Sequence, residues 1–379
     1  MLYGDGLHDD TAALQELLDK AGIVTIDRPG TYLVSKTLII HSNTRLELSP
    51  GAKILAAPMS RCALIENEHF RGNGRDENIE IIGGTWDGNC DAMGMDAVYE
   101  VEHRLDNPYS PDRFMGKLLR FARVDRIVLQ RMTVKDPVSY GIQIGDARGF
   151  VVRDIFFDYN WHFGTTDGVH INGPSCDGVI ENLAGTTNDD MVSLTTYDEP
   201  HAEISLGEIS NVYIHNVGGK NAYSGVRLLS GEGYELRDVR VDGLYGSYRH
   251  HAVIISNHNM RPGRSWIDNI TLENICASKS TTPLGEDCFR YWEQHADKNG
   301  FISFGRGAIC GNVVIRNVYR HQEASTESVL FTMSSRASIE RLYVENLHQT
   351  TAEGVTAPIW SIRGEVGTLI EHDVMHDPE

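Results

Sequence analysis

Two short acidic segments carry the residue types that could perform acid–base chemistry in this sequence. Asp167 lies in the run Thr-Thr-Asp-Gly-Val-His-Ile, and the pair Asp189-Asp190 begins 22 residues later in the run Asn-Asp-Asp-Met-Val-Ser-Leu. If folding brings the three carboxylates together, their repulsion raises the pKa of one of them and keeps a proton available near neutral pH. Glycoside hydrolysis requires this combination, because one carboxyl group must donate a proton while another activates water or attacks the sugar.

Two other interpretations of these acids stay open. An Asp-Gly dipeptide at Asp167 suits a tight turn, and clustered carboxylates are also the ligands that calcium prefers. The hypothesis that we carry forward is acid–base catalysis by Asp189, Asp167 and Asp190, without a metal ion and without a cofactor.

A repeated sequence pattern indicates how the chain could position these acids. Short runs of alternating apolar residues lead to Asn, Asp, Gly or an equivalent residue and then to another apolar residue, with the turn residue at positions 83, 131, 154, 182, 216, 238, 274, 317 and 346. The shortest spacings predict a repeat of about 22 to 28 residues without a helical half, which is typical of a parallel β-helix. Asn suits the turn because it tolerates left-handed backbone angles and can bond to its counterpart one coil away. We therefore predict an all-β chain folded as a single-stranded right-handed parallel β-helix.

The N-terminus and two longer segments complete the predicted domain organisation. Asp9-Asp10-Thr11 precedes an apolar Ala-Leu run that ends near Gly22, which predicts an N-capped helix covering the open end of the stacked sheets. We expect one domain over residues 1–379, with an N-terminal cap at 1–30 and inserted loops at 88–120 and 278–308. Aromatic residues in the second loop suit the apolar faces of sugars, and those that we expect to bind substrate are Tyr291 and Trp292. The alternative is that these loops pack on the β-helix or at a subunit interface.

Aligning the inward apolar pairs of successive coils gives columns of side chains. The pairs are Ile142 and Ile144, Val169 and Ile171, Val192 and Leu194, Val226 and Leu228, and Val253 and Ile255. This alignment places Asp167 and Asp190 on neighbouring coils, about 4.8 Å apart, and continues their column through Ser224 and His251. Alternation along each strand then turns Gln143, His170 and Arg227 away from the core. We expect substrate contacts from His170, Arg227, His251, Ser224 and Gln143.

Two motifs resemble those of known proteins. Gly4-Asp5-Gly6 with Asp9-Asp10-Thr11 resembles the N-terminal cap of pectin-lyase-fold proteins, which include tailspikes and many polysaccharide-active enzymes. The runs around Asp167 and Asp189-Asp190 resemble the Asn-Thr-Asp and Gly-Asp-Asp motifs of the polygalacturonase family, glycoside hydrolase family 28, and the likeness spans nearly the whole chain. The resemblance implies inverting hydrolysis, with Asp189 as general acid and with Asp167 and Asp190 activating water.

The sequence departs from that family at its basic residues. Ser224 stands where the family's Gly-His-Gly motif has His, and the uncharged run Val253-Ile254-Ile255 stands where the family has Arg-Ile-Lys. Because these Arg and Lys residues bind the uronate carboxylate in the family, the resemblance favours hydrolysis more strongly than a galacturonan substrate. Arg227 is a partial replacement.

Charge and composition exclude several function classes. The 34 Lys and Arg residues against 53 Asp and Glu residues give a formal charge of −19, which disfavours nucleic acids and anionic membranes and favours a neutral or weakly charged glycan. No apolar run reaches the length of a membrane helix, and the first ten residues lack the features of a signal peptide. We expect a cytoplasmic protein, or a secreted one if a signal peptide precedes this chain, that acts as a monomer or homo-oligomer. The six scattered cysteines are expected to be mostly reduced and buried.

The sequence therefore predicts a glycosidase that cleaves a polysaccharide or oligosaccharide. The alternatives are a polysaccharide lyase, an epimerase or a fructotransferase on the same fold, and a non-catalytic, tailspike-like protein that binds glycans.

Overall fold

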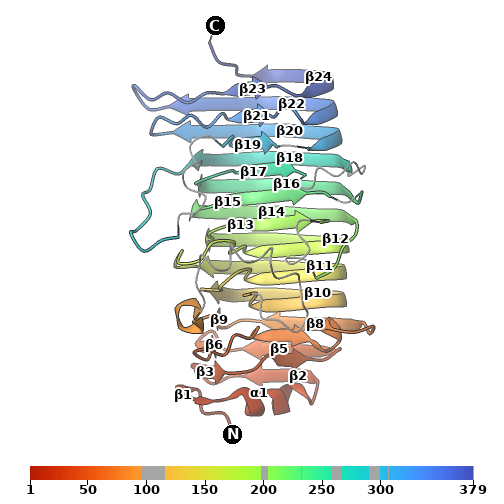
Figure 1. Cartoon of the computed structure of the whole chain (residues 1–379), viewed down its shortest axis with the longest axis vertical. Helices are drawn as coiled ribbons and strands as arrows, with labels where there is room; N and C mark the ends of the chain where they lie inside the picture. Colours follow the sequence, from red (N-terminus) through yellow and green to blue (C-terminus); the bar gives the residue numbers. More distant parts are fainter. Residues whose placement is uncertain are drawn as a thin grey trace.

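The coils of the chain stack along one axis. The structure is a computed structural model that describes residues 1–94, 116–197, 204–231, 233–257, 266–289, 299–305 and 307–378. Figure 1 shows the N-terminal helix at one end of the stack and β24 at the other, with the strands running across the axis between them. Strands of successive coils pair in parallel along the stack. The predicted parallel β-helix is confirmed.

The first of three faces carries most of the residues of the candidate site. It is built from β4 (Leu38–Ile40), β7 (Ile65–Asn67), the first residues of β10 (Leu119–Lys135), β11 (Ile142–Asp158) and β12 (Val169–Thr186), and then β13 (Asp190–Thr195), β15 (Ser224–Leu229), β17 (Val253–Ser256), β19 (Ile302–Phe304), β21 (Phe331–Met333) and β23 (Trp360–Ile362).

The second and third faces are joined by long strands that bend between them. The second face contains β2 (Gly22–Ile26), β5 (Thr44–Leu48), β8 (Asp76–Ile82), the middle of β10 to β12, and the first parts of β14 (Ile209–Ala222), β16 (Glu235–Tyr248), β18 (Trp266–Lys279), β20 (Ile309–Gln322), β22 (Ser338–Thr351) and β24 (Glu365–Val374). The third face contains β1 (Asp5–Asp9), β3 (Gly30–Val34), β6 (Ala52–Ala56), β9 (Thr85–Asp87) and the last parts of those long strands.

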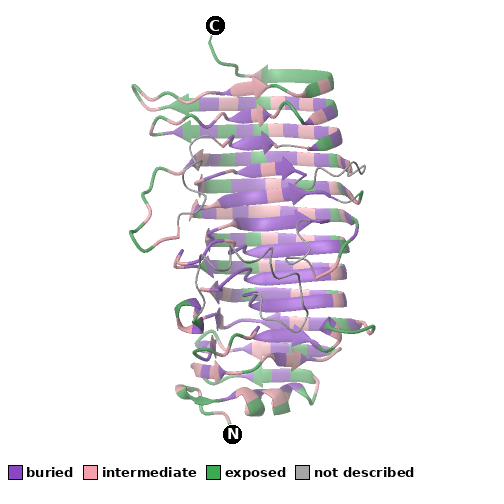
Figure 2. Ribbon diagram, viewed as in Figure 1, coloured by how far each residue is buried: buried purple, intermediate pink, exposed green. Residues whose placement is uncertain are grey.

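The inward columns form the core in the predicted register. Ile142 pairs with Val169, Val169 with Val192, Val192 with Val226, and Val226 with Val253. The side chains of all five are fully buried, and Figure 2 shows buried residues throughout the stacked strands with exposed ones in the loops and in β24. Alternating apolar residues produce this core because every second side chain of a strand points to the same side.

A column of residues with positive φ forms the corner between the second and third faces. Asn182 (φ 56°) donates from Nδ2 to Oδ1 of Asp154 at 2.9 Å, and Asn216 (φ 58°) donates to Oδ1 of Asn182 at 2.6 Å. One coil farther the column has a glycine, and it then resumes through Asn274, Asn317 and Asn346, each of which also has positive φ. The predicted asparagine ladder is confirmed, and it satisfies polar side chains at a turn where β-branched residues would be strained.

One assigned turn residue was wrong. Asp238 has positive φ but lies at the other corner, between the first and second faces, where it accepts a hydrogen bond from Asn269. The residue that aligns with Asn216 and Asn274 in that coil is Gly243 (φ 83°). The spacing from residue 216 to the next turn is therefore 27 residues and not 22. Both corners favour Asn and Asp, so residue type alone does not distinguish them.

The predicted N-terminal helix is present as α1 (Thr11–Leu18), which buries Leu14 and Leu18 against the first coils. The expected capping role of Asp10 is corrected by its contacts, because its carboxylate makes no capping bond and accepts hydrogen bonds from the backbone N–H groups of Tyr3 and Gly4. The helix thus covers the end of the sheets, while Asp10 ties the preceding segment to it.

The segments predicted as inserted loops are described in part. In the first, a short 3₁₀ helix spans Cys90–Met93 and Leu119 already belongs to β10, and in the second, Ser278 and Lys279 end β18. Another short 3₁₀ helix, Glu68–Phe70, precedes both segments. The six cysteines are unpaired, as expected, but only Cys90 and Cys310 are buried. Among the described residues, no helix is long and apolar enough to cross a membrane.

Candidate functional site

Backbone pairing brings the three predicted acids to one corner of the first face. Asp167 precedes β12. One coil away, Asp190 begins β13 and Asp189 directly precedes it. The N–H of Gly168 donates to the carbonyl of Asp190 at 2.9 Å, and the N–H of Asp190 donates to Oδ1 of Asp167 at 3.1 Å. These bonds lock the two segments together, so the side chains meet without depending on a flexible loop.

The three carboxyl groups form a tight cluster. One oxygen each from Asp167, Asp189 and Asp190 lies within 4.8 Å of the others, with Asp167 and Asp190 buried and Asp189 half-buried. Burial raises the pKa of Asp190, and the guanidinium of Arg227, whose Nη1 is 3.4 Å from Oδ2 of Asp190, opposes part of that shift. We call these three residues the Asp cluster.

A buried histidine, His170, contacts the Asp cluster at Asp167. His170 Nδ1 lies 2.6 Å from Oδ2 of Asp167, and its Nε2 lies 3.3 Å from Nδ2 of Asn172. Because the amide of Asn172 is the donor in the second contact, the imidazole donates its Nδ1 proton to Asp167. Its ring stacks on Tyr140 with centroids 4.2 Å apart, and Gln143 donates to Oδ1 of Asn172 at 2.9 Å. The network Gln143–Asn172–His170 therefore orients the carboxylate of Asp167.

Toward the C-terminus, the same column changes from acidic to neutral. Ser224 pairs with Asp190 in the register, and the next coil presents His251, whose Nδ1 lies 2.6 Å from the carbonyl oxygen of Gly300. Burial, together with the positive charges of Lys279 and Arg227, lowers the pKa of His251 to about 3. His251 is therefore neutral above that pH and can accept a hydrogen bond at Nε2.

The structure brings together most of the residues that we expected to contact substrate. His170, Arg227 and Ser224 lie beside the Asp cluster, Gln143 acts through Asn172, and His251 lies two coils from Asp190. Tyr291 and Trp292 lie outside the described residues.

Two contributors were missed by the sequence interpretation. Asn172 occupies the next outward position after His170 on β12, which strand alternation could have indicated. Asn188 holds the segment before the acids through an Nδ2 bond to the carbonyl of Phe163 at 2.6 Å, which no spacing predicts.

The Asp cluster also meets the requirements for binding a hard cation. Three carboxylates with oxygens this close match the ligand type that calcium prefers, which is the alternative left open by the sequence. Arg227 already places a positive charge against Asp190, however, and so supplies part of the compensation that a metal ion would provide.

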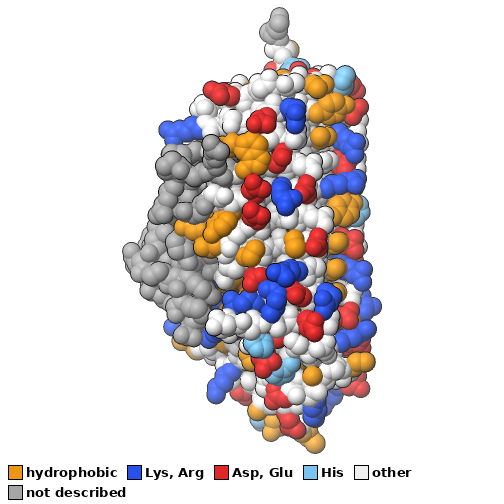
Figure 3. Space-filling model, turned by 90° about the vertical axis from the view of Figure 1, so that its right-hand side faces the viewer, with side chains coloured by type: hydrophobic (Ala, Val, Ile, Leu, Met, Phe, Trp, Pro, Cys, Tyr) orange, Lys and Arg blue, Asp and Glu red, His pale blue; other side chains and the backbone are white. Residues whose placement is uncertain are grey.

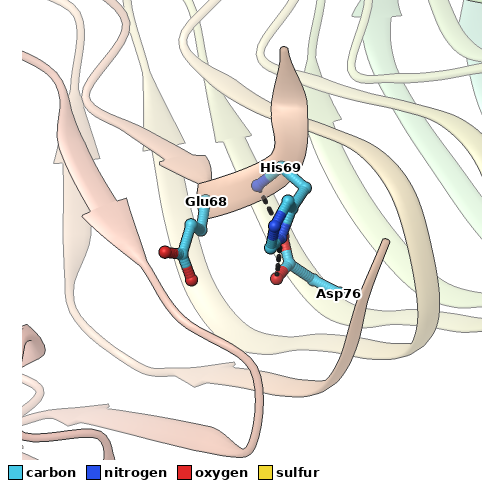
Figure 4. A group of neighbouring side chains, drawn as sticks. All are labelled: Glu68, His69 and Asp76. Carbon is cyan, nitrogen blue, oxygen red and sulfur yellow. Dashed lines mark hydrogen bonds and ion pairs between the residues drawn. The ribbon is translucent and has the colours of Figure 1, made fainter. Parts of the chain in front are cut away.

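A second carboxylate–histidine cluster lies near the N-terminal end and was not predicted. Figure 4 shows the imidazole of His69 turned toward the carboxylate of Asp76, with Glu68 to one side. The carboxylate of Asp76 accepts hydrogen bonds from Nδ1 and the backbone N–H of His69, from Nδ2 of Asn67 and from Oγ of Ser42, at 2.7 to 2.9 Å. Burial would raise the pKa of Asp76, but these bonds hold it below its usual value. With both oxygens engaged by protein donors, Asp76 is a structural anchor.

Comparison with known proteins now places the fold. The chain is similar to the family 28 exopolygalacturonase of Yersinia enterocolitica, with 15% identity and a TM-score of 0.60, covering 100% of this chain and 77% of that one. It is also similar to a hyperthermoactive exopolygalacturonase from Thermotoga maritima, with 14% identity and a TM-score of 0.59, covering 98% of this chain and 90% of that one. The chain has the pectin-lyase fold of these polygalacturonases.

The same fold occurs in a tailspike protein of Escherichia coli bacteriophage HK620, with 14% identity and a TM-score of 0.62, where the match covers 94% of this chain and 61% of the tailspike. No protein-family model and no curated protein sequence matches the chain. The structural comparisons therefore establish the architecture, and the function has to be inferred from the site.

Proposed function

We propose that this protein is a glycoside hydrolase whose Asp cluster cleaves a polysaccharide or oligosaccharide. The observation that carries the proposal is the meeting of three carboxyl groups within 4.8 Å at one corner of the first face. Like charges at this distance favour retention of a proton by the cluster, so acid and base functions coexist at one pH. The polygalacturonase-like fold supports a carbohydrate substrate.

In the proposed reaction, Asp189 donates its proton to the glycosidic oxygen while the bond between that oxygen and the anomeric carbon breaks. Asp189 is the least buried of the three, which suits contact with the leaving group. Asp167 and Asp190 hold the attacking water, whose proton passes to one of them as its oxygen bonds to the anomeric carbon. The raised pKa of Asp190 suits it to accept a proton in that step.

The supporting residues have distinct roles in this proposal. His170 keeps the carboxylate of Asp167 oriented, and Arg227 offsets negative charge at Asp190. Ser224 and His251 present neutral polar groups to the sugar that extends toward the C-terminal end. No cofactor takes part in this scheme.

The distance between the carboxyl groups bears on whether hydrolysis inverts or retains the configuration of the anomeric carbon. Inverting enzymes usually separate the two carboxyl groups by about 6.5–9.5 Å and retaining enzymes by about 5–5.5 Å, and the nearest oxygens of the Asp cluster are closer than the inverting range. The resemblance to family 28 implies inversion. The anomer of the first product, measured by NMR during hydrolysis, decides between the two.

The test is a screen of the purified full chain against a panel of glycans, followed by the variants Asp189→Asn and Asp190→Asn on the best substrate. Folded variants that kept full activity would overturn the assignment. A product that absorbs in the ultraviolet would instead identify a lyase, and binding without turnover in the wild type would identify a glycan-binding protein.

A further inference from the structure

A polar pocket lies at the same corner as the Asp cluster but farther toward the C-terminus. The corner that leads from the third face to the first contains Asp189 in one coil, and it continues through Arg249, Lys279 and Gln322 at the ends of β16, β18 and β20. Between these three successive coils lies a pocket of about 290 Å³. We call it the corner pocket.

The charge of the corner pocket differs from that of the molecule. Its lining includes two cations, Arg249 and Lys279, and none of the described lining residues is acidic. Hydroxyl groups surround them, from Thr281, Thr282, Ser325 and Thr326. In a chain with a formal charge of −19, and in contrast to the interspersed acidic and basic side chains of Figure 3, this composition is complementary to an anion.

The cations are held in place by protein contacts. Lys279 is 3% exposed, and its Nζ donates to the carbonyl of His250 at 2.6 Å. Nη1 of Arg249 donates to the carbonyl of Thr282 at 2.6 Å, and its guanidinium lies 5.7 Å from the ring centroid of Trp161. Because these contacts already orient the guanidinium of Arg249, it loses little conformational entropy when it binds a planar or tetrahedral oxyanion.

The corner pocket and the Asp cluster lie along one line parallel to the axis. Arg249 is two coils beyond Asp190 and Gln322 is four coils beyond it, which corresponds to roughly 10–19 Å at the spacing of paired strands. His251 lies on the first face in the same coil as Arg249, and the charge of Lys279 contributes to the lowered pKa of that histidine. At this spacing, the two sites are within reach of one oligosaccharide.

We propose that the corner pocket binds an oxyanion substituent, a carboxylate or a sulfate or phosphate ester, of the glycan that occupies the Asp cluster. The proposal rests on the proposed function, because it places a glycan at that cluster. It modifies the expectation of a neutral substrate, since a sugar that is neutral at the cleaved bond can carry its charge several residues away.

The test is calorimetric binding to the full chain, which does not require turnover. The probes are oligosaccharides of equal length that are unsubstituted, O-sulfated or built from hexuronic acid, with inorganic sulfate as a competitor. We expect a charged probe to bind at least tenfold more tightly than the neutral one, and the preferred charged probe identifies the source of the oxyanion. Arg249→Gln is expected to weaken that probe by about ten- to a hundredfold and to leave the neutral probe unchanged.

Three further variants separate recognition from folding. Thr281 is exposed, so Thr281→Glu places a negative charge in the corner pocket without disturbing the core and is expected to remove the preference, whereas Thr281→Ala retains it. Arg363→Gln removes an exposed charge in the last coil and is the matched control, with no expected effect.

Equal binding of neutral and charged probes by the wild type would overturn the proposal, as would equal weakening of both by Thr281→Glu. A preference for charged probes in a protein that hydrolyses none of them would support the corner pocket and overturn the proposed hydrolysis. Hydrolysis without any such preference would do the reverse.

Discussion

Two pairs of aspartate and histidine in this molecule, each with a buried carboxylate, have the same composition and different surroundings. At the N-terminal end, His69 bonds to Asp76 at 2.9 Å, and in the Asp cluster His170 bonds to Asp167 at 2.6 Å. Asp76 also receives donors from Asn67, Ser42 and the backbone, and its pKa is lowered. Asp167 instead lies against two further carboxyl groups, and the pKa of Asp190 beside it is raised. The neighbouring donors, more than the residue types, separate a structural anchor from a candidate catalytic group.

The largest expected difference between the two regions is in catalysis. Asp189→Asn removes the proposed acid and should lower kcat by about 10²–10⁴-fold, because proton transfer from a positioned group contributes that much. Asp76→Asn should leave kcat within about twofold in the folded fraction. Initial rates on the best substrate, with circular dichroism as the control for folding, measure both, and equal losses would contradict the distinction.

The two histidines provide a finer comparison. His170→Gln should lower kcat by about 10–100-fold and shift the pH–rate profile, because His170 donates to the carboxylate that holds water. His69→Gln is the matched control and should change neither. A purely structural role of His170 would reduce the folded fraction and leave the pH profile of the remaining activity in place.

Stability should show the opposite ranking. Asp76→Ala leaves the donors of Asn67, Ser42 and His69 without their acceptor, which should cost about 3 kcal/mol in the free energy of unfolding. Asp189→Ala, at a half-buried position, should cost less than about 1 kcal/mol. Urea denaturation measures both, and a larger cost at Asp189 would mean that the cluster is structural.

The smallest expected effects are the pH dependences, which should have opposite signs. The folded pKa of Asp76 lies below its unfolded value, so its contribution to stability is present above about pH 4 and is lost as the pH falls through the folded pKa. The folded pKa of Asp190 is raised, so its ionisation costs stability as the pH rises above about 4. At pH 7, Asp190→Asn should therefore raise Tm by about 1–3 °C.

The gain from Asp190→Asn should disappear at pH 3, where both states of the wild type are protonated at this position. Tm values measured from pH 3 to pH 8 for the wild type, Asp190→Asn and Asp76→Asn check the two signs. A gain from Asp190→Asn that persisted unchanged at pH 3 would show that its origin is not ionisation.

Much of the fold was predictable because a β-helix repeats its physical requirements in each coil. The alternation in the runs around Val169, Val192 and Val226 predicted the inward columns, and these columns predicted the pairing of Asp190 with Ser224. Asparagine predicted the corners but confused two of them at Asp238 and Gly243, because each corner needs a residue that tolerates positive φ.

The parts that could not be predicted depend on side-chain direction and on loops from separate coils. Alternation turned His170 outward, but only its rotamer decides that Nδ1 meets Asp167. The carboxylate of Asp76 accepts hydrogen bonds from Ser42, Asn67 and His69, which belong to no repeated motif. The corner pocket combines Arg249, Thr282 and Ser325, and the different lengths of the intervening segments conceal that these residues are neighbours.

Coil stacking also fixes the distances between sites along the axis of the protein. The distance between the Asp cluster and the corner pocket is a whole number of coils, each contributing about 4.8 Å, and the paired strands prevent any intermediate value. Removing or duplicating one coil between them would change their separation by about 4.8 Å and leave the residues of both sites in place. In such an architecture, the number of coils between two sites determines which spacing between two functional groups of a ligand both sites can bind.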